Sequence, residues 1–572
     1  MRGPARTRPV RVALTAAVAV AVSAAAATPA GAITGGAIDS RFASCGQATG
    51  LVPRDIAGRQ FSYGAGSALA AQPDGKIVAA GPASRGMGAT RFNPDGTLDT
   101  SFGGDGVAFV PLGGRFDQTR VTAVAIQPDG KVVAAGWLRT AEATSFEQHF
   151  VIARFTPSGE PDTTFSGDGL VDEAPAGATT AAVNAIAAAP GGALVLAGEV
   201  DGRFAVVRYR DDGTIDPAFG EGGVARVASA TRPNGRGAAV FLRPDGRIVA
   251  AGHTNAGSSD LAFTVARLTP TGGPDLGFGG TGSVTETFDE SSRATALVPL
   301  PDGRLYAVGE TDDLWGDDEG GGTTRRAAIV RYLENGERDD AFAGDGSVLD
   351  ALGQGLYAMV LPTAAALDAD GRLTVATGRG PLVRYTADGR RDAAFGLGGV
   401  LTAFSVPSGD SLLALPDGGL ILGGENGRQG LRPAGFEFGP AIMRLAGSGQ
   451  ALESVRGQPG ACFLRVRNPS LPHLLRRGRV AKYGKLIVGL FLTQPTPGSG
   501  LIRATATAGG STFEVGSVSF ATRYAGSTSF EIKVRKSAYR RLTRVAGARI
   551  SITATFADRD TAAVTASRTL RR

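Results

Sequence analysis

The chain has 572 residues, a formal net charge of +6, 42% apolar residues and 85 glycines. It contains three histidines and two cysteines, so catalysis that depends on histidine or thiol groups has little support. No P-loop, dinucleotide-binding fingerprint, nucleophile elbow or zincin helix is present, and these enzyme classes are therefore not indicated.

The N-terminus, residues 1–32, has the composition of a secretory signal peptide. Four arginines precede an apolar run from Val12 to Ala27, and small residues follow up to Ala32. An uncleaved membrane anchor is the alternative, but the apolar run is short for a membrane span. We expect cleavage after Ala32, a secreted or cell-surface protein, and no integral membrane segment in the mature chain.

A repeated pattern fills the central part of the chain. In six copies an Arg is followed by Gly five residues on, Asp eight on, Phe eleven on and Gly fifteen on. A period of this size indicates a repeat architecture. The Arg and Asp positions are Arg91 and Asp99, Arg154 and Asp162, Arg208 and Asp216, Arg267 and Asp275, Arg331 and Asp339, and Arg384 and Asp392.

The spacing within each copy predicts a hairpin. A three-residue turn such as Pro94-Asp95-Gly96, with Gly in the left-handed conformation, is a common hairpin connection. Pairing about Asp95 places Arg91 opposite Asp99. Each hairpin should therefore carry one cross-strand ion pair, and a feature common to every copy is interpreted as structural rather than as a ring of metal ligands.

A second hairpin precedes each of these, with turns such as QPDGK at residues 72–76 and 127–131. Two hairpins per copy give four short strands, the content of a propeller blade. The seventh copy has Arg444 but lacks the downstream Asp and Phe, whereas Asp39, Phe42 and Gly46 show that missing spacing at the N-terminus. The sequence predicts an all-β protein whose residues 33–462 form a seven-bladed β-propeller, closed by strand exchange between the termini.

The elements RFNPDGTLDTSFGGDG and QPDGKIVAAG resemble the bacterial delta-60 repeat family over roughly residues 36–446. That resemblance implies a propeller-type repeat. The family has no established general activity, and the resemblance implies no catalytic positions.

Of the two cysteines, Cys45 lies in the predicted N-terminal closing strand and Cys462 just after the last blade. In an exported protein we expect them to form a disulfide that holds the exchanged strand. The alternative of reactive or metal-binding thiols has little support, because neither has a histidine or third cysteine nearby in the sequence.

The connections between the two hairpins of each blade vary in length and should share the face opposite the short turns. Variable loops on a regular scaffold are where binding usually occurs. Aromatic and histidine residues in them would suit a glycan or protein ligand, although packing of loop against loop would also explain them. The candidate binding residues are Trp137, His149, His253, Trp315, Phe436 and Phe438.

The fifth of these connections is acidic. Five carboxylates within eight residues could bind calcium, which takes six to eight oxygen ligands. A solvated acidic loop is the alternative, since the spacing matches no known calcium loop. The residues are Asp312, Asp313, Asp317, Asp318 and Glu319.

Residues 463–572 lack the repeat and contain short β-type runs that predict a β-sandwich, loosely similar to Ig-like modules. This segment holds 20 Lys and Arg but four Asp and Glu. Such a basic domain could attach to an anionic cell-wall polymer, with solubility as the alternative explanation; nucleic acid is not expected for an exported protein.

We expect a non-catalytic binding or scaffold protein that recognises a glycan or protein through the variable-loop face, without a cofactor unless calcium binds. The alternative is a carbohydrate-active hydrolase or lyase that uses carboxylates at the propeller axis.

Overall fold

The structure is a computed structural model of the chain and describes residues 47–49, 68–83, 86–112, 116–140, 148–175, 177–227, 231–255, 261–288, 291–315, 322–352, 361–378, 381–396, 398–401, 411–425, 440–445, 461–467, 485–492, 498–508, 511–522, 526–533, 537–538, 549–556 and 564–569. Strands and short turns make up nearly all of this part of the chain. No helix in it has the length and apolarity needed to cross a membrane.

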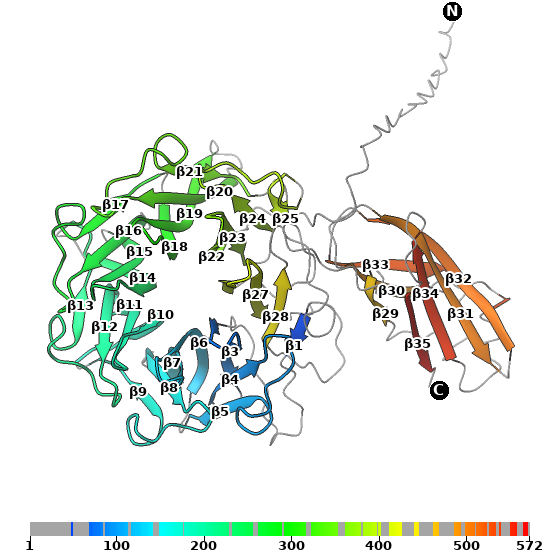
Figure 1. Cartoon of the computed structure of the whole chain (residues 1–572), viewed down its shortest axis with the longest axis horizontal. Coiled ribbons are helices and arrows are strands. Elements are labelled where there is room, and N and C mark those ends of the chain that lie inside the picture. Colours follow the sequence, from blue (N-terminus) through cyan, green and yellow to red (C-terminus); the bar gives the residue numbers. More distant parts are fainter. Residues whose placement is uncertain are drawn as a thin grey trace, which may run out of the picture.

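Seven four-stranded antiparallel sheets are the blades of a β-propeller, arranged around a central axis (Figure 1). In the first six blades the strands pair in chain order from the axis outward. The first three blades are β2 (Ala68–Ala71), β3 (Ile77–Ala83), β4 (Gly86–Phe92) and β5 (Val107–Pro111); β6 (Phe116–Ile126), β7 (Val132–Thr140), β8 (Gln148–Phe155) and β9 (Leu170–Glu173); and β10 (Ala181–Ala188), β11 (Leu194–Val200), β12 (Arg203–Tyr209) and β13 (Val224–Arg226). The next three are β14 (Asn234–Leu242), β15 (Ile248–Asn255), β16 (Leu261–Leu268) and β17 (Ser283–Glu286); β18 (Ser291–Pro299), β19 (Leu305–Trp315), β20 (Gly322–Tyr332) and β21 (Ser347–Asp350); and β22 (Pro362–Leu367), β23 (Leu373–Thr377), β24 (Leu382–Tyr385) and β25 (Val400–Leu401).

The seventh blade combines both ends of the propeller segment. Strands β26 (Ser411–Ala414), β27 (Leu420–Glu425) and β28 (Pro440–Leu445) are completed by β1 (Gln47–Thr49), which lies beside β28 (Figure 1). Gln47 pairs with Met443, and this register equals that of Val107 with Thr90 in the first blade. The predicted seven-bladed propeller with an exchanged N-terminal strand is therefore confirmed.

The hydrophobic core lies between neighbouring blades. Seven apolar clusters fill the seven interfaces, and the last of them joins Leu69 and Ile77 of the first blade to Ile421 and Ile442 of the seventh. Because each blade is covered on both faces, its middle strands are buried along their whole length, as in β4. This burial explains the nearly continuous apolar runs in the repeat.

The recurring Arg of each complete copy is held inside its own blade. Its Nε lies 2.5–2.8 Å from Oδ2 of the recurring Asp in all six copies. Its Cζ lies 4.5–5.1 Å from the ring centroid of the recurring Phe, a cation–π contact. The six Arg–Asp pairs are thus structural ion pairs.

The same Arg also bonds to the next blade. Nη1 of Arg91 donates to the carbonyl oxygen of Pro157 at 2.6 Å, and Nη1 of Arg331 donates to that of Ala387 at 2.6 Å. Arg444 of the seventh blade donates to the carbonyl of Pro94 in the first blade at 3.4 Å. The acceptor in each case is the first residue of the three-residue turn, so the repeat encodes both the blade and its contact with the following blade.

The described strands after residue 460 form two further sheets. One has the order β29 (Ala461–Arg467), β30 (Lys485–Leu492), β33 (Gly526–Lys533). The other has the order β32 (Ser511–Thr522), β31 (Gly498–Ala508), β34 (Arg549–Phe556), β35 (Val564–Thr569). Strand β29 lies beside β35 of the other sheet, which is the two-sheet arrangement expected of a β-sandwich.

Candidate functional site at the propeller axis

The innermost strand of five blades contains a β-bulge at an equivalent position. Register shifts at these positions leave one residue outside the pairing, eight residues before the Gly of the following turn. A bulge bends its strand and redirects a side chain. The bulge residues are Thr122, Asn184, Ala238, Thr295 and Thr363.

The bulge explains the Gly that recurs within the second strand of most blades. A Cβ built on Gly136 would lie 1.8 Å from the carbonyl oxygen of Arg120, and one on Gly252 would lie 2.0 Å from that of Arg236. Gly309 has the same relation to Arg293, also at 2.0 Å. Any side chain there would displace the inner strand, so the repeated AAG-type sequence preserves the shape of the axis.

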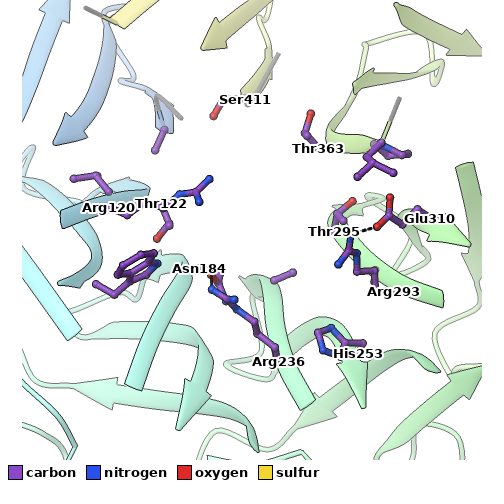
Figure 2. Close-up of a pocket in the computed structure, with 17 residues that line it drawn as sticks. Arg120, Thr122, Asn184, Arg236, His253, Arg293, Thr295, Glu310, Thr363 and Ser411 are labelled. Atoms are coloured by element: carbon purple, nitrogen blue, oxygen red, sulfur yellow. Dashed lines mark hydrogen bonds and ion pairs between the residues drawn. The ribbon is translucent and has the colours of Figure 1, made fainter. Parts of the chain in front are cut away.

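A cavity of about 470 Å³ lies at this axis, and side chains of the innermost strands surround it (Figure 2). Every one of the seven inner strands contributes a lining residue or flanks one. Its lining residues are Ala68, Arg120, Val121, Thr122, Trp137, Asn184, Arg236, Ala238, His253, Arg293, Ala294, Thr295, Glu310, Leu361, Pro362, Thr363 and Ser411. It lies toward the ends of the blades that carry the variable connections, because Trp137, His253 and Glu310 each follow the Gly that precedes such a connection.

Three arginines and one carboxylate give the cavity its charge. Arg293 forms an ion pair with Glu310, whose side chain is buried. Nη2 of the half-buried Arg236 donates to Oδ1 of Asn184 at 2.7 Å, which is a neutral acceptor. Arg120 is exposed, and no carboxylate in the described part of the chain forms an ion pair with it. The described lining is therefore cationic.

The pKa shifts of the lining residues agree with the positive charge of the described lining. Burial lowers the pKa of His253, the positive charges of Arg293 and Arg236 add to this effect, and together they bring the pKa to about 4. Burial also lowers the pKa of Arg236, partly offset by Glu199 and reinforced by Arg120 and Arg293. Burial raises the pKa of Glu310, while Arg293 opposes this change. His253 is consequently neutral near pH 7.

The polar bulge residues fix the geometry of the lining. Oγ1 of Thr122 donates to the carbonyl oxygen of Val183 at 2.7 Å, and Nδ2 of Asn184 donates to that of Gly237 at 2.6 Å. Each acceptor belongs to the next blade, so these bonds join adjacent inner strands. The geometry of the described lining is thus set by the strands of the scaffold.

The structure brings two of the predicted binding residues into the cavity, Trp137 and His253. Both were expected in loops. They lie instead in β7 and β15, because antiparallel pairing continues beyond Gly136 and Gly252. Trp137 pairs with Phe150, and His253 pairs with Phe263. His149 lies in β8, with Nε2 3.7 Å from Oδ1 of Asp172.

The described lining of the cavity contains none of the other predicted binding residues. Trp315 ends strand β19, paired with Gly322, rather than lying in a loop. Phe436 and Phe438 lie outside the described residues.

The acidic cluster is divided in the same way. Asp312 and Asp313 lie in β19 rather than in a loop, and Oδ1 of Asp312 is 3.0 Å from Nε of Arg325. Asp317, Asp318 and Glu319 lie outside the described residues. Within the described part, no three His, Cys, Asp or Glu side chains gather as metal ligands would. Calcium binding stays a prediction.

The cysteine pairing also stays a prediction. Cys462 lies in β29, whereas Cys45 lies outside the described residues.

The sequence analysis did not identify the three cavity arginines. Arg120, Arg236 and Arg293 each stand ten residues before the Gly of the following turn, two positions before the bulge residue. This common offset could have been recognised in the sequence. It is present in three copies, however, and without the bulge nothing indicates that the position faces the axis.

Four segments of the chain match the family described as "Domain of unknown function (DUF5122) beta-propeller", at residues 72–102, 127–165, 191–219 and 243–278. Each segment contains short hairpin turns of the kind that lie on the face opposite the variable connections. No curated protein matches the sequence.

Several solved structures are similar in fold. PorZ, a bacterial surface component of the type-IX secretion system of Porphyromonas gingivalis, is 13% identical with a TM-score of 0.35, and the match covers 88% of this chain and 59% of PorZ. The chain thus spans about three fifths of the length of PorZ. A protein of unknown function from Dyadobacter fermentans is 12% identical with a TM-score of 0.35, over 71% of this chain and 99% of that protein. A chain in the structure of Drosophila Plexin A in complex with Semaphorin 1b is 9% identical with a TM-score of 0.36, over 72% of this chain and 88% of that chain.

Proposed function

We propose that this is an exported, non-catalytic binding protein whose propeller receives a glycan in the axial cavity. The observation that carries the proposal is the cavity itself. It lies toward the face of the variable connections and combines hydrogen-bonding side chains with the indole of Trp137. Polar groups and an aromatic surface in a preformed cavity suit a small polar ligand.

The volume of the cavity favours a small ligand over a folded partner. About 470 Å³ is within the ~300–1,000 Å³ range of small-molecule sites. A protein partner would need a contact area far larger than this cavity. The end of a sugar chain fits such a space.

The lining gives little support to the alternative of a carbohydrate-active hydrolase. Glycoside hydrolysis by the common mechanisms needs two carboxyl groups on either side of the scissile bond. Glu310 is the one carboxylate among the described lining residues, and it is ion-paired with Arg293. The described cavity therefore supplies binding groups without that catalytic pair.

Other parts of the proposal rest on the sequence. Residues 1–32 would direct export, a Cys45–Cys462 disulfide would secure the exchanged strand, and the basic segment after residue 463 would hold the protein at an anionic cell-wall polymer. Assignment to the delta-60 repeats and to Ig-like modules belongs with these proposals.

A binding screen tests the function. The mature chain, from residue 33 onward, would be applied to an array of neutral and acidic glycans, and each positive glycan would then be incubated with the protein and assayed for new reducing ends. We expect binding without product release. New reducing ends formed in proportion to the protein would establish the hydrolase instead.

A further inference from the structure

The described lining of the cavity carries an excess of positive charge. Glu310 neutralises Arg293, which leaves Arg236 and Arg120. Arg236 is half-buried and bonded to the neutral side chain of Asn184; Glu199 lies close enough to act on its charge but does not line the cavity. Charged groups withdrawn from water are normally paired, because their desolvation is costly. An anionic group of a ligand would supply the missing partner.

The three arginines line the same cavity. Arg236 experiences the repulsion of both Arg120 and Arg293, which places each of these two charges within electrostatic range of Arg236. Figure 2 shows the side chains of Arg120, Arg236 and Arg293 around the same central opening. Guanidinium groups bind carboxylate, sulfate and phosphate through paired, charge-assisted hydrogen bonds. One anionic group at the axis could therefore contact more than one of them.

Trp137 adds an aromatic surface at the same place. It pairs across the strands with Arg120, lines the cavity and is half-buried. An indole ring packs well against a flat, partly apolar face, and a sugar ring has such a face.

We infer that the axial cavity selects an acidic sugar, in which an anionic group binds Arg120 and Arg236 while the sugar ring contacts Trp137. This inference rests on the proposed function and specifies its ligand class. Carboxylate and sulfate groups share the required chemistry, so both a uronic acid and a sulfated sugar are candidates.

The test compares acidic and neutral sugar oligomers of the same length, with inorganic phosphate as an anion that has no sugar ring. The full mature chain would be titrated calorimetrically with galacturonic acid oligomers, with galactose oligomers of the same length, with sulfated galactose oligomers and with inorganic phosphate. We expect one acidic series to bind at least ~10-fold more tightly than the neutral series. Its affinity should fall between ~50 and ~300 mM NaCl, because salt screens exposed charges.

Two variants locate the site. Arg120→Gln and Arg236→Gln should each weaken acidic-glycan binding by ~10-fold or more. Arg390→Gln is the matched control, because its side chain is 86% exposed and lies in a turn at the opposite face. Circular dichroism would verify folding, and Arg120→Gln alone is decisive because Arg120 is exposed.

The outcomes separate the two claims. Equal binding of neutral and acidic oligomers, or binding unaffected by Arg120→Gln, would overturn the acidic-sugar inference and leave the glycan-binding function standing. Inorganic phosphate that binds as tightly as the acidic oligomers would also overturn it, since the sugar would then contribute nothing. Failure of every glycan to bind would reject the proposed function itself.

Discussion

Nη1 of Arg91 donates a 2.6 Å hydrogen bond to the carbonyl oxygen of Pro157, which lies in a turn of the next blade. The same guanidinium forms an ion pair with Asp99 and covers the ring of Phe102. One side chain therefore orders its own blade and connects it to the following one. Because a propeller is stable through contacts between neighbouring blades, this relationship explains why the Arg recurs with the Asp and the Phe.

The first prediction tests this dual contact. Arg91→Lys keeps the positive charge but cannot bond to Asp99 and Pro157 simultaneously in the fork geometry of Arg. We expect a loss of about 2–3 kcal/mol in the free energy of unfolding, measured by urea denaturation. Arg390→Lys is the control, because Arg390 is exposed and should change stability by less than ~0.5 kcal/mol. Equal effects of the two substitutions would contradict the assigned role of Arg91.

Turn spacing made most of the fold predictable. The offset from Arg to Asp determines the hairpin register, and Phe92 indeed pairs with Leu98 across the turn. The exchanged strand could also be found, because Gly46 precedes β1 as Gly106 precedes β5. The lengths of the strands were harder to predict from the sequence. In the second, fourth and fifth blades pairing continues past the recurring Gly of the second strand. This continuation depends on contacts between the two ends of the connection, which no local sequence pattern shows.

The second prediction concerns acid. Burial alone would raise the pKa of Asp99, but hydrogen bonds from Ser101 and Lys76 and the pairing with Arg91 outweigh it and hold the pKa well below its usual range. A carboxylate with a lowered folded-state pKa stabilises the protein above the unfolded pKa near 4, and this stabilisation is lost as pH falls through the folded value. Stability should therefore decrease as the pH falls below about 4.

Asp99→Asn measures the contribution of this carboxylate. At pH 7 the variant should lose about 3–5 kcal/mol in the free energy of unfolding, because the buried Arg91 loses its counter-charge. Its stability should also fall less steeply than that of the wild type between pH 4 and pH 2. Asp105→Asn is the comparison, since Asp105 is exposed and its side chain only accepts a turn hydrogen bond from Val107. Parallel acid profiles for Asp99→Asn and the wild type would refute this account.

The third prediction tests whether Gly136 is needed for the shape of the axial cavity. A Cβ at position 136 would meet the carbonyl oxygen of Arg120 at 1.8 Å, so Gly136→Ala should displace the inner strand of the second blade. We expect a loss of about 1–3 kcal/mol in stability together with weaker glycan binding. Gly273→Ala is the control, because its nearest atom would be Oγ1 of Thr269 at 3.4 Å. Wild-type affinity in a folded Gly136→Ala protein would show that the bulge does not position Arg120.

The candidate site was predictable only in part. Trp137 and His253 were found because aromatic and histidine residues are rare enough in this chain to attract attention. Arg120, Arg236 and Arg293 were not found, because arginine is abundant and also serves as the recurring structural residue. The orientation of these three depends on bulges in the inner strands, which are backbone irregularities without a residue type of their own.

The fourth prediction uses the two tryptophans as probes. In a Trp315→Phe variant the remaining fluorescence comes from Trp137, which lines the cavity. A glycan bound at the axis should shift this emission and reduce its quenching by acrylamide. The Trp137→Phe variant should show no ligand-dependent change. A response that persists without Trp137 would place the ligand elsewhere.

The fifth prediction concerns His253, which is one of three histidines and can be assigned by comparison with His253→Gln. Burial and the charges of Arg293 and Arg236 lower its pKa to about 4, against about 6.5 in an unfolded chain. The unfolded state therefore binds more protons between these values. The contribution of His253 to stability should be constant above pH 6.5, decline as the pH falls from 6.5 to 4, and level off below 4.

Two measurements check this expectation. Proton NMR titration should give the imidazole a pKa near 4, and His253→Gln should remove on the order of 2 kcal/mol of the acid destabilisation that accumulates between pH 6.5 and 4. A bound acidic sugar should raise the pKa of His253, because its anionic group offsets the charge of Arg236. A neutral oligomer of the same length is the control and lacks this electrostatic effect. A His253 pKa near 6.5 in the free protein would show that the cationic, partly dry environment assigned to the axis is wrong.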